Sequence, residues 1–266
     1  MKRVITALFL VPAVVFIVLY TAAIWLLLSV ILITLIALAE YNRLSAVKPG
    51  DRLSDFLVLL FGAATPILFF AGASSYVPAL AMMAAFAFFA LGMIRSSEFK
   101  AVFLNTAVRT FGVIYIALPF SYFILLRGME NGGRWILLLF TVIWANDTFA
   151  MLAGKTIGKH KLSPMISPGK TVEGAVGGLV GGGVAALLYN NFLSMGLGPG
   201  SILLLAAVIG IVGIFGDLFE SVIKRAAGEK DSGTIIPGHG GMLDRVDSLV
   251  FAVPLLYYYL TIGRFL

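Results

Sequence analysis

The densest group of charged residues in this chain lies between residues 221 and 247, in a sequence of which only 12% is charged. The segment reads SVIKRAAGEKDSGTIIPGHGGMLDRVD and is flanked on both sides by long apolar runs. Lysine and arginine side chains neutralise phosphate groups, and aspartates hold divalent cations that bridge phosphates. Because charges held against a bilayer are costly, so dense a group predicts a functional site for phosphorylated substrates.

Carboxylates at the borders of this segment are candidate metal ligands. In a helix, Asp217, Ser221 and Lys224 would share one face, and Asp244 and Asp247 would share a face at the start of the next apolar run. Mg²⁺ prefers oxygen ligands from one or two carboxylates together with substrate phosphates. We therefore expect Asp217 and Asp244, from two neighbouring helices, to bind Mg²⁺. The alternative, in which Asp217 only pairs with Lys224 or Arg225 to neutralise a buried charge, stays open.

The basic residues and glycines of the segment favour anion binding. Glycines at 240 and 241 leave the backbone free of side chains, so that it can approach a phosphate closely. A juxtamembrane basic patch with a flexible loop is the simpler alternative. The candidate catalytic residues here are Lys224, Arg225, Lys230, Asp231, His239, Arg245 and Asp247, and the candidate substrate-binding residues are Ser221, Gly240 and Gly241.

A second polar motif lies earlier, at residues 144–147 (WAND) and 158–174 (GKHKLSPMISPGKTVEG). Polar residues inside the apolar run at 146 and 147 are costly unless they meet a partner or a wet cavity. Glu173 follows the expected start of a helix at Thr171, where an acid is favourable, so a simple capping or helix-dipole role is its alternative. The candidate substrate-binding residues are Asn146, Asp147, Lys159, His160, Lys161, Ser167, Lys170, Thr171 and Glu173.

The elements that must position these residues are membrane helices. The chain is 60% hydrophobic with a mean hydropathy of +1.02, far above a soluble domain. Nine apolar segments are long enough, or nearly so, to cross a bilayer. They run approximately over residues 4–20, 21–40, 54–71, 76–94, 106–126, 134–153, 171–193, 201–223 and 246–263. We therefore predict an all-α, polytopic integral membrane protein with about nine transmembrane helices.

Charge placement predicts the orientation. With nine spans, every basic residue except Arg127, Arg134 and Arg264 falls on the face that holds the N-terminus. The positive-inside rule then makes the N-terminus and the polar loops cytoplasmic. Topology and anionic lipid also account for the net charge of +6, so we expect no nucleic-acid binding. The absence of cysteine excludes thiolate metal sites.

The segment from Ser221 to Asp247 closely resembles the signature of phosphatidate cytidylyltransferases (CDP-diacylglycerol synthases), S-x-x-K-R-x4-K-D-x-G-x3-P-G-H-G-G-x-x-D-R-x-D, at every fixed position. Residues 158–174 resemble a second region of that family, G-K-H-K-L-x-P-x-I-S-P-K-K-T-x-E-G. The one departure is Gly169, where the family commonly has lysine.

This resemblance covers roughly the last half of the chain. It implies transfer of a cytidylyl group from CTP to phosphatidic acid, with Mg²⁺ and possible room for a second, monovalent cation. It also implies a multi-pass protein of the inner (plasma) membrane with its active site on the cytoplasmic face.

We expect residues 1–105 to be structural transmembrane helices that could form a homodimer contact, and residues 106–266 to be the catalytic region. Two other functions remain open at this point. A CTP-dependent kinase of a long-chain alcohol would need the same ligands, but the intact run from His239 to Asp247 argues against it. A cation-coupled transporter would place carboxylates near the bilayer midplane in related halves. Here the charges gather at one edge of the spans instead.

Overall fold

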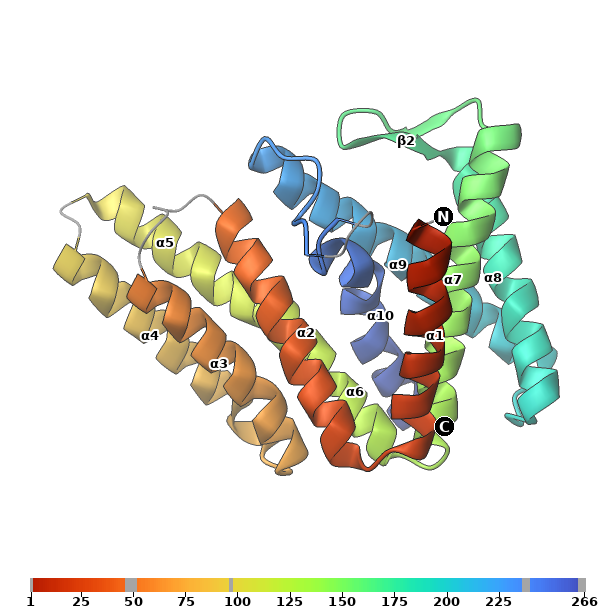
Figure 1. Ribbon diagram of the computed structural model, residues 1–266, viewed down its shortest axis with the longest axis horizontal. Coiled ribbons are helices and arrows are strands. Elements are labelled where there is room, and N and C mark those ends of the chain that lie inside the picture. Colours follow the sequence, from red (N-terminus) through yellow and green to blue (C-terminus); the bar gives the residue numbers. More distant parts are fainter. Residues whose placement is uncertain (1, 46–51, 96–97, 236–239, 263–266) are drawn as a thin grey trace. The chain divides into compact units, whose positions relative to one another are not determined.

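The computed structural model describes residues 2–45, 52–95, 98–235 and 240–262, and side chains from Val11 onward (Figure 1). The regular structure of the described residues is helical, as predicted, with the exception of one small hairpin. The helices are α1 (Lys2–Tyr20), α2 (Ala23–Leu44), α3 (Arg52–Phe70), the short 3-10 helix η1 (Ser74–Tyr76), α4 (Val77–Arg95), α5 (Phe99–Gly112), the π-helix η2 (Val113–Ala117), α6 (Leu118–Gly128), α7 (Gly132–Thr156), α8 (Val172–Leu193), α9 (Pro199–Ala226) and α10 (Leu243–Ile262). The strands are β1 (Lys161–Ser163) and β2 (Ser167–Thr171).

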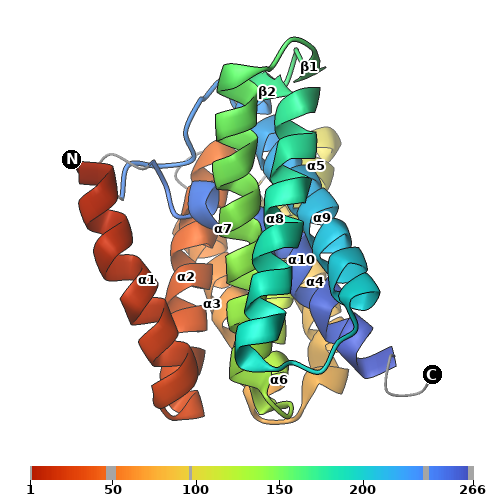
Figure 2. The ribbon, with the colours of Figure 1, turned by 90° about the vertical axis from the view of Figure 1, so that its right-hand side faces the viewer.

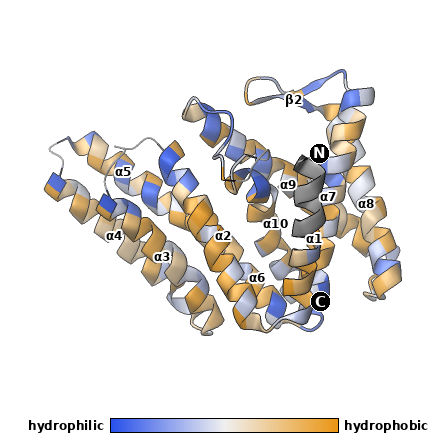
Figure 3. Cartoon of the chain, viewed as in Figure 1, coloured by the Kyte–Doolittle hydropathy of each residue, from blue (hydrophilic) through white to orange (hydrophobic). Residues whose placement is uncertain are grey.

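Within the described residues, eight helical segments are long and apolar enough to cross a membrane, with α5, η2 and α6 forming one of them. A shorter apolar stretch, Val11–Tyr20, belongs to α1. Figure 3 shows apolar residues along the helices and hydrophilic residues near their ends and in the connections. The protein is therefore a polytopic membrane protein, in agreement with the prediction. Helices α2 and α5 extend beyond the predicted segments 21–40 and 106–126: α2 continues to Leu44, and α5 already begins at Phe99.

The chain divides into two compact units. Unit 1 comprises residues 1–128 and 226–246. In it α2 packs on α3 and α6, and α3 and α5 pack on α4. An ion pair joins α5 to α3, with Arg109 Nη1 2.6 Å from Asp55 Oδ1, and buries the guanidinium. Because a side chain at Gly112 would collide with the ring of Tyr41, this glycine permits the close approach of α2 to the start of the π-helix.

Unit 2 comprises residues 129–225 and 247–266 and is dominated by the pair α7 and α8, which lie side by side (Figure 2). Glycines of α8 face α7, and their small size allows the two helices to pack closely. A Cβ on Gly174 would lie 2.8 Å from the carbonyl oxygen of Ala150, and one on Gly178 would lie 2.6 Å from Asn146 Oδ1. The antiparallel hairpin of β1 and β2 connects the two helices and was not expected from the sequence.

Candidate functional site

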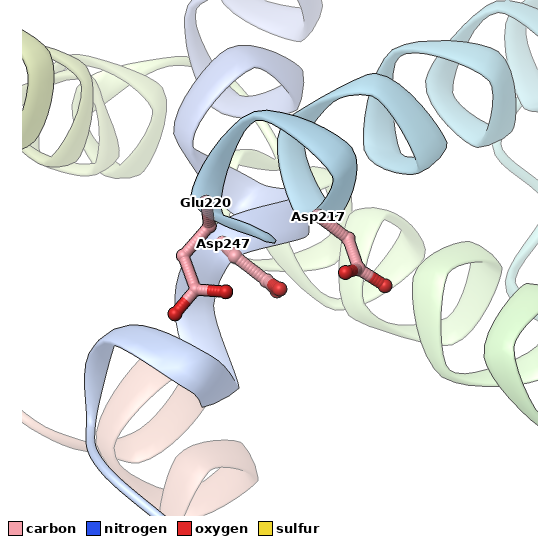
Figure 4. Close-up of side chains that lie close together, drawn as sticks. All are labelled: Asp217, Glu220 and Asp247. Atoms are coloured by element: carbon pink, nitrogen blue, oxygen red, sulfur yellow. The ribbon is translucent and has the colours of Figure 1, made fainter. Parts of the chain in front are cut away.

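Three carboxylates lie close together in unit 2, and we call them the acidic cluster: Asp217 and Glu220 of α9 and Asp247 of α10 (Figure 4). One oxygen from each lies within 4.8 Å of the others. The side chains of Asp217 and Glu220 meet because they are three residues apart in one helix. Asp247 reaches them because α9 has a glycine at position 216, where any Cβ would strike the Asp247 carbonyl oxygen.

Two lysines balance most of this negative charge. Lys170 Nζ, from strand β2, lies 2.7 Å from Asp217 Oδ2, and Lys224 forms an ion pair with Glu220 one turn along α9. Glu220 is fully buried. The pairing of Asp217 therefore differs from the alternative that the sequence left open, since its basic partner comes from the hairpin rather than from its own helix.

Two further candidate residues of α9, Ser221 and Arg225, also have hydrogen-bond partners. Ser221 Oγ lies 3.4 Å from Asp217 Oδ1, at the limit of a hydrogen bond, which supports the expected shared face. Arg225 Nε donates to the carbonyl oxygen of Ile166 at 3.2 Å and so helps to hold the hairpin.

A cavity of about 340 Å³ opens beside the acidic cluster. It is lined by residues of α7, the hairpin, α8, α9 and α10: Asn146, Asp147, Ala150, Met151, Gly154, Lys155, Leu162, Gly169, Lys170, Thr171, Gly174, Ala175, Ile214, Asp217 and Ser248. Asn146 is 3% exposed, and its Oδ1 has no hydrogen-bond partner among the described residues. This oxygen packs against α8, where a Cβ on Gly178 would lie 2.6 Å from it, so Asn146 lines the cavity with other atoms of its side chain or backbone.

The hairpin is fixed to the start of α8 by two side chains. Thr171 caps the helix by accepting the Gly174 amide at 3.0 Å. Glu173 accepts the backbone amides of Lys159 and His160 at 3.1 and 3.2 Å, and His160 Nδ1 lies 2.6 Å from its Oε1. Thr171 therefore caps α8, whereas Glu173 connects the loop before β1 to the start of α8.

The remaining candidates of the hairpin point to solvent or sit at its edge. Lys161 is exposed in β1, and Ser167 is half-buried at the first position of β2.

Candidates in the loop before α10 belong to unit 1. Asp244 Oδ2 accepts hydrogen bonds from Ser232 N, Ser232 Oγ and Gly241 N, each at 2.8 Å. Gly240 has φ +79°, a left-handed conformation that favours glycine. The other candidates of the loop are exposed: Lys230, Asp231 and Arg245. His239 lies outside the described residues.

Three residues near the acidic cluster were not assigned a role from the sequence. Glu220 is the most important, because it completes the group of three carboxylates. A signal for it existed, since it lies three residues after Asp217 in the same apolar run. Lys155 and Ser248 line the cavity, and nothing in their local sequence singles them out.

Comparison with known proteins gives consistent matches over nearly all of the chain. The model of a family described as the cytidylyltransferase family matches residues 1–263. Phosphatidate cytidylyltransferase of Staphylococcus haemolyticus is 41% identical over 177 residues, which are 66% of this chain and 67% of that protein. The protein of the same name from Staphylococcus epidermidis is 37% identical over 237 residues, covering 87% of this chain and 88% of the relative. The one from Staphylococcus aureus is 36% identical over 229 residues and 85% of each chain.

Proposed function

Since the chain belongs to the cytidylyltransferase family, we propose that it transfers the cytidylyl group of CTP to phosphatidic acid, which gives CDP-diacylglycerol and pyrophosphate. The relatives that are 36–41% identical to this chain over the matched residues carry the name of this activity. The proposal is assigned to specific residues by one observation: the acidic cluster pairs with two lysines beside the cavity.

In this reaction a phosphate oxygen of phosphatidic acid forms a bond to the α-phosphorus of CTP. The bond from that phosphorus to the oxygen bridging the α- and β-phosphates breaks, and pyrophosphate leaves with its electron pair. The nucleophile is already anionic at neutral pH, so no Ser-His-Asp arrangement is needed to activate it. The protein has instead to bring two polyanions together and to neutralise their charge.

The acidic cluster fits a divalent cation. Mg²⁺ takes hard oxygen ligands, and the three carboxylates offer such oxygens within 4.8 Å of one another. We propose that Asp217 and Asp247 hold Mg²⁺, with Glu220 nearby. When bound, the ion would supply charge neutralisation at the phosphates of CTP. The acidic character of the site would also accommodate a second, monovalent cation.

We also propose that Asp244, the other metal ligand expected from the sequence, binds Mg²⁺. Its Oδ2 already accepts three hydrogen bonds from the loop, so a metal bond would have to come from its Oδ1. An Asp244→Asn variant separates the metal-binding role from the loop-ordering role.

Basic residues next to the acidic cluster are proposed to bind the triphosphate. Lys170 and Lys224 each pair with a carboxylate of the acidic cluster, so each can exchange that partner for a phosphate oxygen without long-range movement. Lys155 lies on the cavity wall and adds a third positive charge. Arg225, Lys230 and Arg245 are further candidates for the leaving pyrophosphate.

The polar end of the cavity is proposed to take the nucleotide. Asn146 and Asp147 both line this part of the cavity. The hairpin residues Lys159, His160, Lys161 and Ser167 form the adjacent polar edge, held in place through Glu173.

The proposed location is the inner (plasma) membrane, with the hairpin and the loop before α10 on the cytoplasmic face. Because α7 runs without a break from Gly132 to Thr156, its two ends should face opposite sides of the bilayer. The chain has no cysteine, so single cysteines can report this directly. Met165→Cys in the hairpin should react with a membrane-impermeant maleimide only in inverted vesicles, and Glu130→Cys before α7 only in right-side-out vesicles. The reverse labelling would overturn the orientation.

A homodimer contact through the helices of residues 1–105 also remains a proposal. The mass of the detergent-solubilised protein, measured by light scattering with the detergent contribution subtracted, tests it. A monomeric mass at micromolar protein would contradict it.

The experiment that tests the function follows α-³²P-CTP incubated with dioleoyl phosphatidic acid, Mg²⁺ and purified protein in detergent micelles. Label should pass into a chloroform-soluble CDP-lipid, and unlabelled pyrophosphate should be released in equal amount. Folded protein that leaves all label in the aqueous phase would overturn the proposal. A parallel reaction with γ-³²P-CTP and a polyprenol distinguishes a kinase, which would label the lipid from the γ-position.

A further inference from the structure

A buried carboxylate from the N-terminal half of the chain holds the loop that precedes α10. Glu40 lies near the end of α2 and is 4% exposed. Its Oε1 accepts the backbone amide of Met242 at 2.9 Å, and its Oε2 accepts that of Leu243 at 2.8 Å. The two partners are about two hundred residues apart in sequence, which makes this a long-range contact.

These amides belong to the start of α10, which begins at Leu243. The first N–H groups of a helix have no partner within the helix and carry partial positive charge. A residue just before the helix usually satisfies them. Here Glu40 does so from another helix, so the start of α10 depends on where α2 places this carboxylate.

The loop itself is tied to the same helix at a second point. Arg43, one turn after Glu40, donates from Nη2 to the carbonyl oxygen of Ser232 at 2.6 Å. Ser232 Oγ lies 3.2 Å from Glu40 Oε2 and 2.8 Å from Asp244 Oδ2. Since a hydroxyl has a single proton, it can donate to only one of these carboxylates at a time.

Two glycines show how tightly the loop surrounds Glu40. A Cβ on Gly241 would lie 2.6 Å from both carboxylate oxygens of Glu40, and one on Gly233 would lie 2.8 Å from its Cδ. Any side chain at these positions would therefore push the loop away from the carboxylate.

We infer that Glu40 is a positioning residue for the proposed cytidylyl transfer, through residues 230–235 and 240–245 of the loop before α10. This loop carries Lys230, Asp244 and Arg245, and the helix that it starts carries Asp247 in its next turn. The helices of residues 1–105 thus have a role in the chemistry beyond forming a scaffold. The expected effect on kcat rests on the proposed function, whereas the expected effect on cleavage of the loop by trypsin does not.

The test compares Glu40→Gln with Thr34→Val, a near-isosteric change of a fully buried residue two turns earlier in the same helix. Glutamine keeps one acceptor oxygen but replaces the other with an NH₂ group that cannot accept from a backbone amide. We expect kcat to fall about tenfold or more, with KM for CTP changed less, because a charged acceptor of buried amides is lost. Trypsin cleavage after the exposed Lys230 should become several-fold faster at a temperature where the protein remains folded.

Thr34→Val should leave kcat and the cleavage rate unchanged without lowering the melting temperature, because the buried Thr34 Oγ1 has no hydrogen-bond partner among the described residues. If Glu40→Gln does not yield folded protein, Ser232→Ala tests the same contact from the loop side and should give faster cleavage and lower kcat. Wild-type kcat together with wild-type cleavage in a folded Glu40→Gln or Ser232→Ala variant would overturn the inference. If the wild-type protein forms no CDP-lipid, the proposed function fails, and the cleavage comparison still decides whether Glu40 holds the loop.

Discussion

Two groups of carboxylates, one in each compact unit, have very different partners. In unit 1, Glu40 and Asp244 together accept hydrogen bonds from four backbone amides and one hydroxyl. In unit 2, the acidic cluster has like charges within 4.8 Å and lysine partners on flexible side chains. A backbone amide cannot leave its carboxylate partner unless the loop unfolds. A lysine side chain can leave its carboxylate partner while the backbone stays folded.

This contrast separates carboxylates that hold structure from carboxylates that can exchange partners with a ligand. A carboxylate fixed by amides stabilises one conformation of the loop around it. Carboxylates kept close by packing, with their repulsion offset by lysines, are suited to accept a cation while the lysines turn to phosphate. The following predictions test this distinction between the two groups.

The largest effect is expected from Asp217→Asn and Asp247→Asn in the acidic cluster. Each change removes a charged oxygen ligand, so CDP-lipid formation should fall by about 10²- to 10³-fold. The Mg²⁺ concentration for half-maximal rate should rise at the same time. Initial rates across a magnesium titration give both values. Melting temperatures equal to or above the wild type would show that the loss is not one of folding. Unchanged magnesium dependence in both variants would contradict the metal role.

Asp244→Asn sharpens the comparison because this residue is a candidate ligand that also holds the loop. If it mainly orders the loop, the variant should lower the melting temperature and speed trypsin cleavage after Lys230, with an unchanged magnesium requirement. If it binds metal through Oδ1, the magnesium requirement should rise instead, as in Asp217→Asn.

A smaller effect is expected for Lys170→Met. This lysine is 24% exposed and lines the cavity, so its loss should raise KM for CTP roughly ten- to thirtyfold by removing a charge-assisted contact to phosphate. KM for phosphatidic acid should change less. Lys100→Met, at an exposed position in α5, is the charge-matched control and should leave both constants near the wild type. Equal effects of the two variants would mean that only net charge matters.

Gly174→Ala tests the scaffold that carries Lys170 to the acidic cluster. The added Cβ would lie 2.8 Å from the carbonyl oxygen of Ala150 and 2.9 Å from Thr171 Oγ1, so α8 must move away from α7. We expect the free energy of unfolding in detergent to fall by about 2 kcal/mol through overpacking. In Gly200→Ala, at the start of α9, the new Cβ meets nothing within 4 Å and should change stability by less than about 0.5 kcal/mol. Similar losses in both would show that glycine at 174 is not needed for packing.

The fold class followed from the sequence because apolar segments of membrane length are a strong signal. Helix ends were less predictable, since α2 runs on through the polar residues Tyr41 and Arg43, where hydropathy falls but helical hydrogen bonds continue. The hairpin was missed because its strands are only three and five residues long and carry no alternating apolar pattern.

The candidate site was predictable where spacing within one helix decides proximity, as for Asp217 and Ser221. It was not predictable where residues distant in sequence meet. Nothing near Lys170 indicates that it pairs with Asp217, and nothing near Glu40 indicates that it holds a loop some two hundred residues later. Such contacts depend on which helices become neighbours, and that depends on packing over the whole unit.

The smallest effect is expected at Gly169, where the motif that this segment resembles commonly has lysine. This glycine lines the cavity next to Lys170, and a Cβ there would meet nothing within 4 Å, so a lysine fits without steric cost. Gly169→Lys should lower KM for CTP about two- to fourfold, because a partly exposed charge adds little in a screened setting. The gain should disappear in about 0.5 M salt, where the Debye length is only a few ångströms. Gly198→Lys, also free of contacts but between α8 and α9, is the control and should leave KM unchanged. An unchanged KM in Gly169→Lys at low salt would mean that phosphate does not reach this end of the cavity, and the triphosphate would then have to lie nearer the acidic cluster.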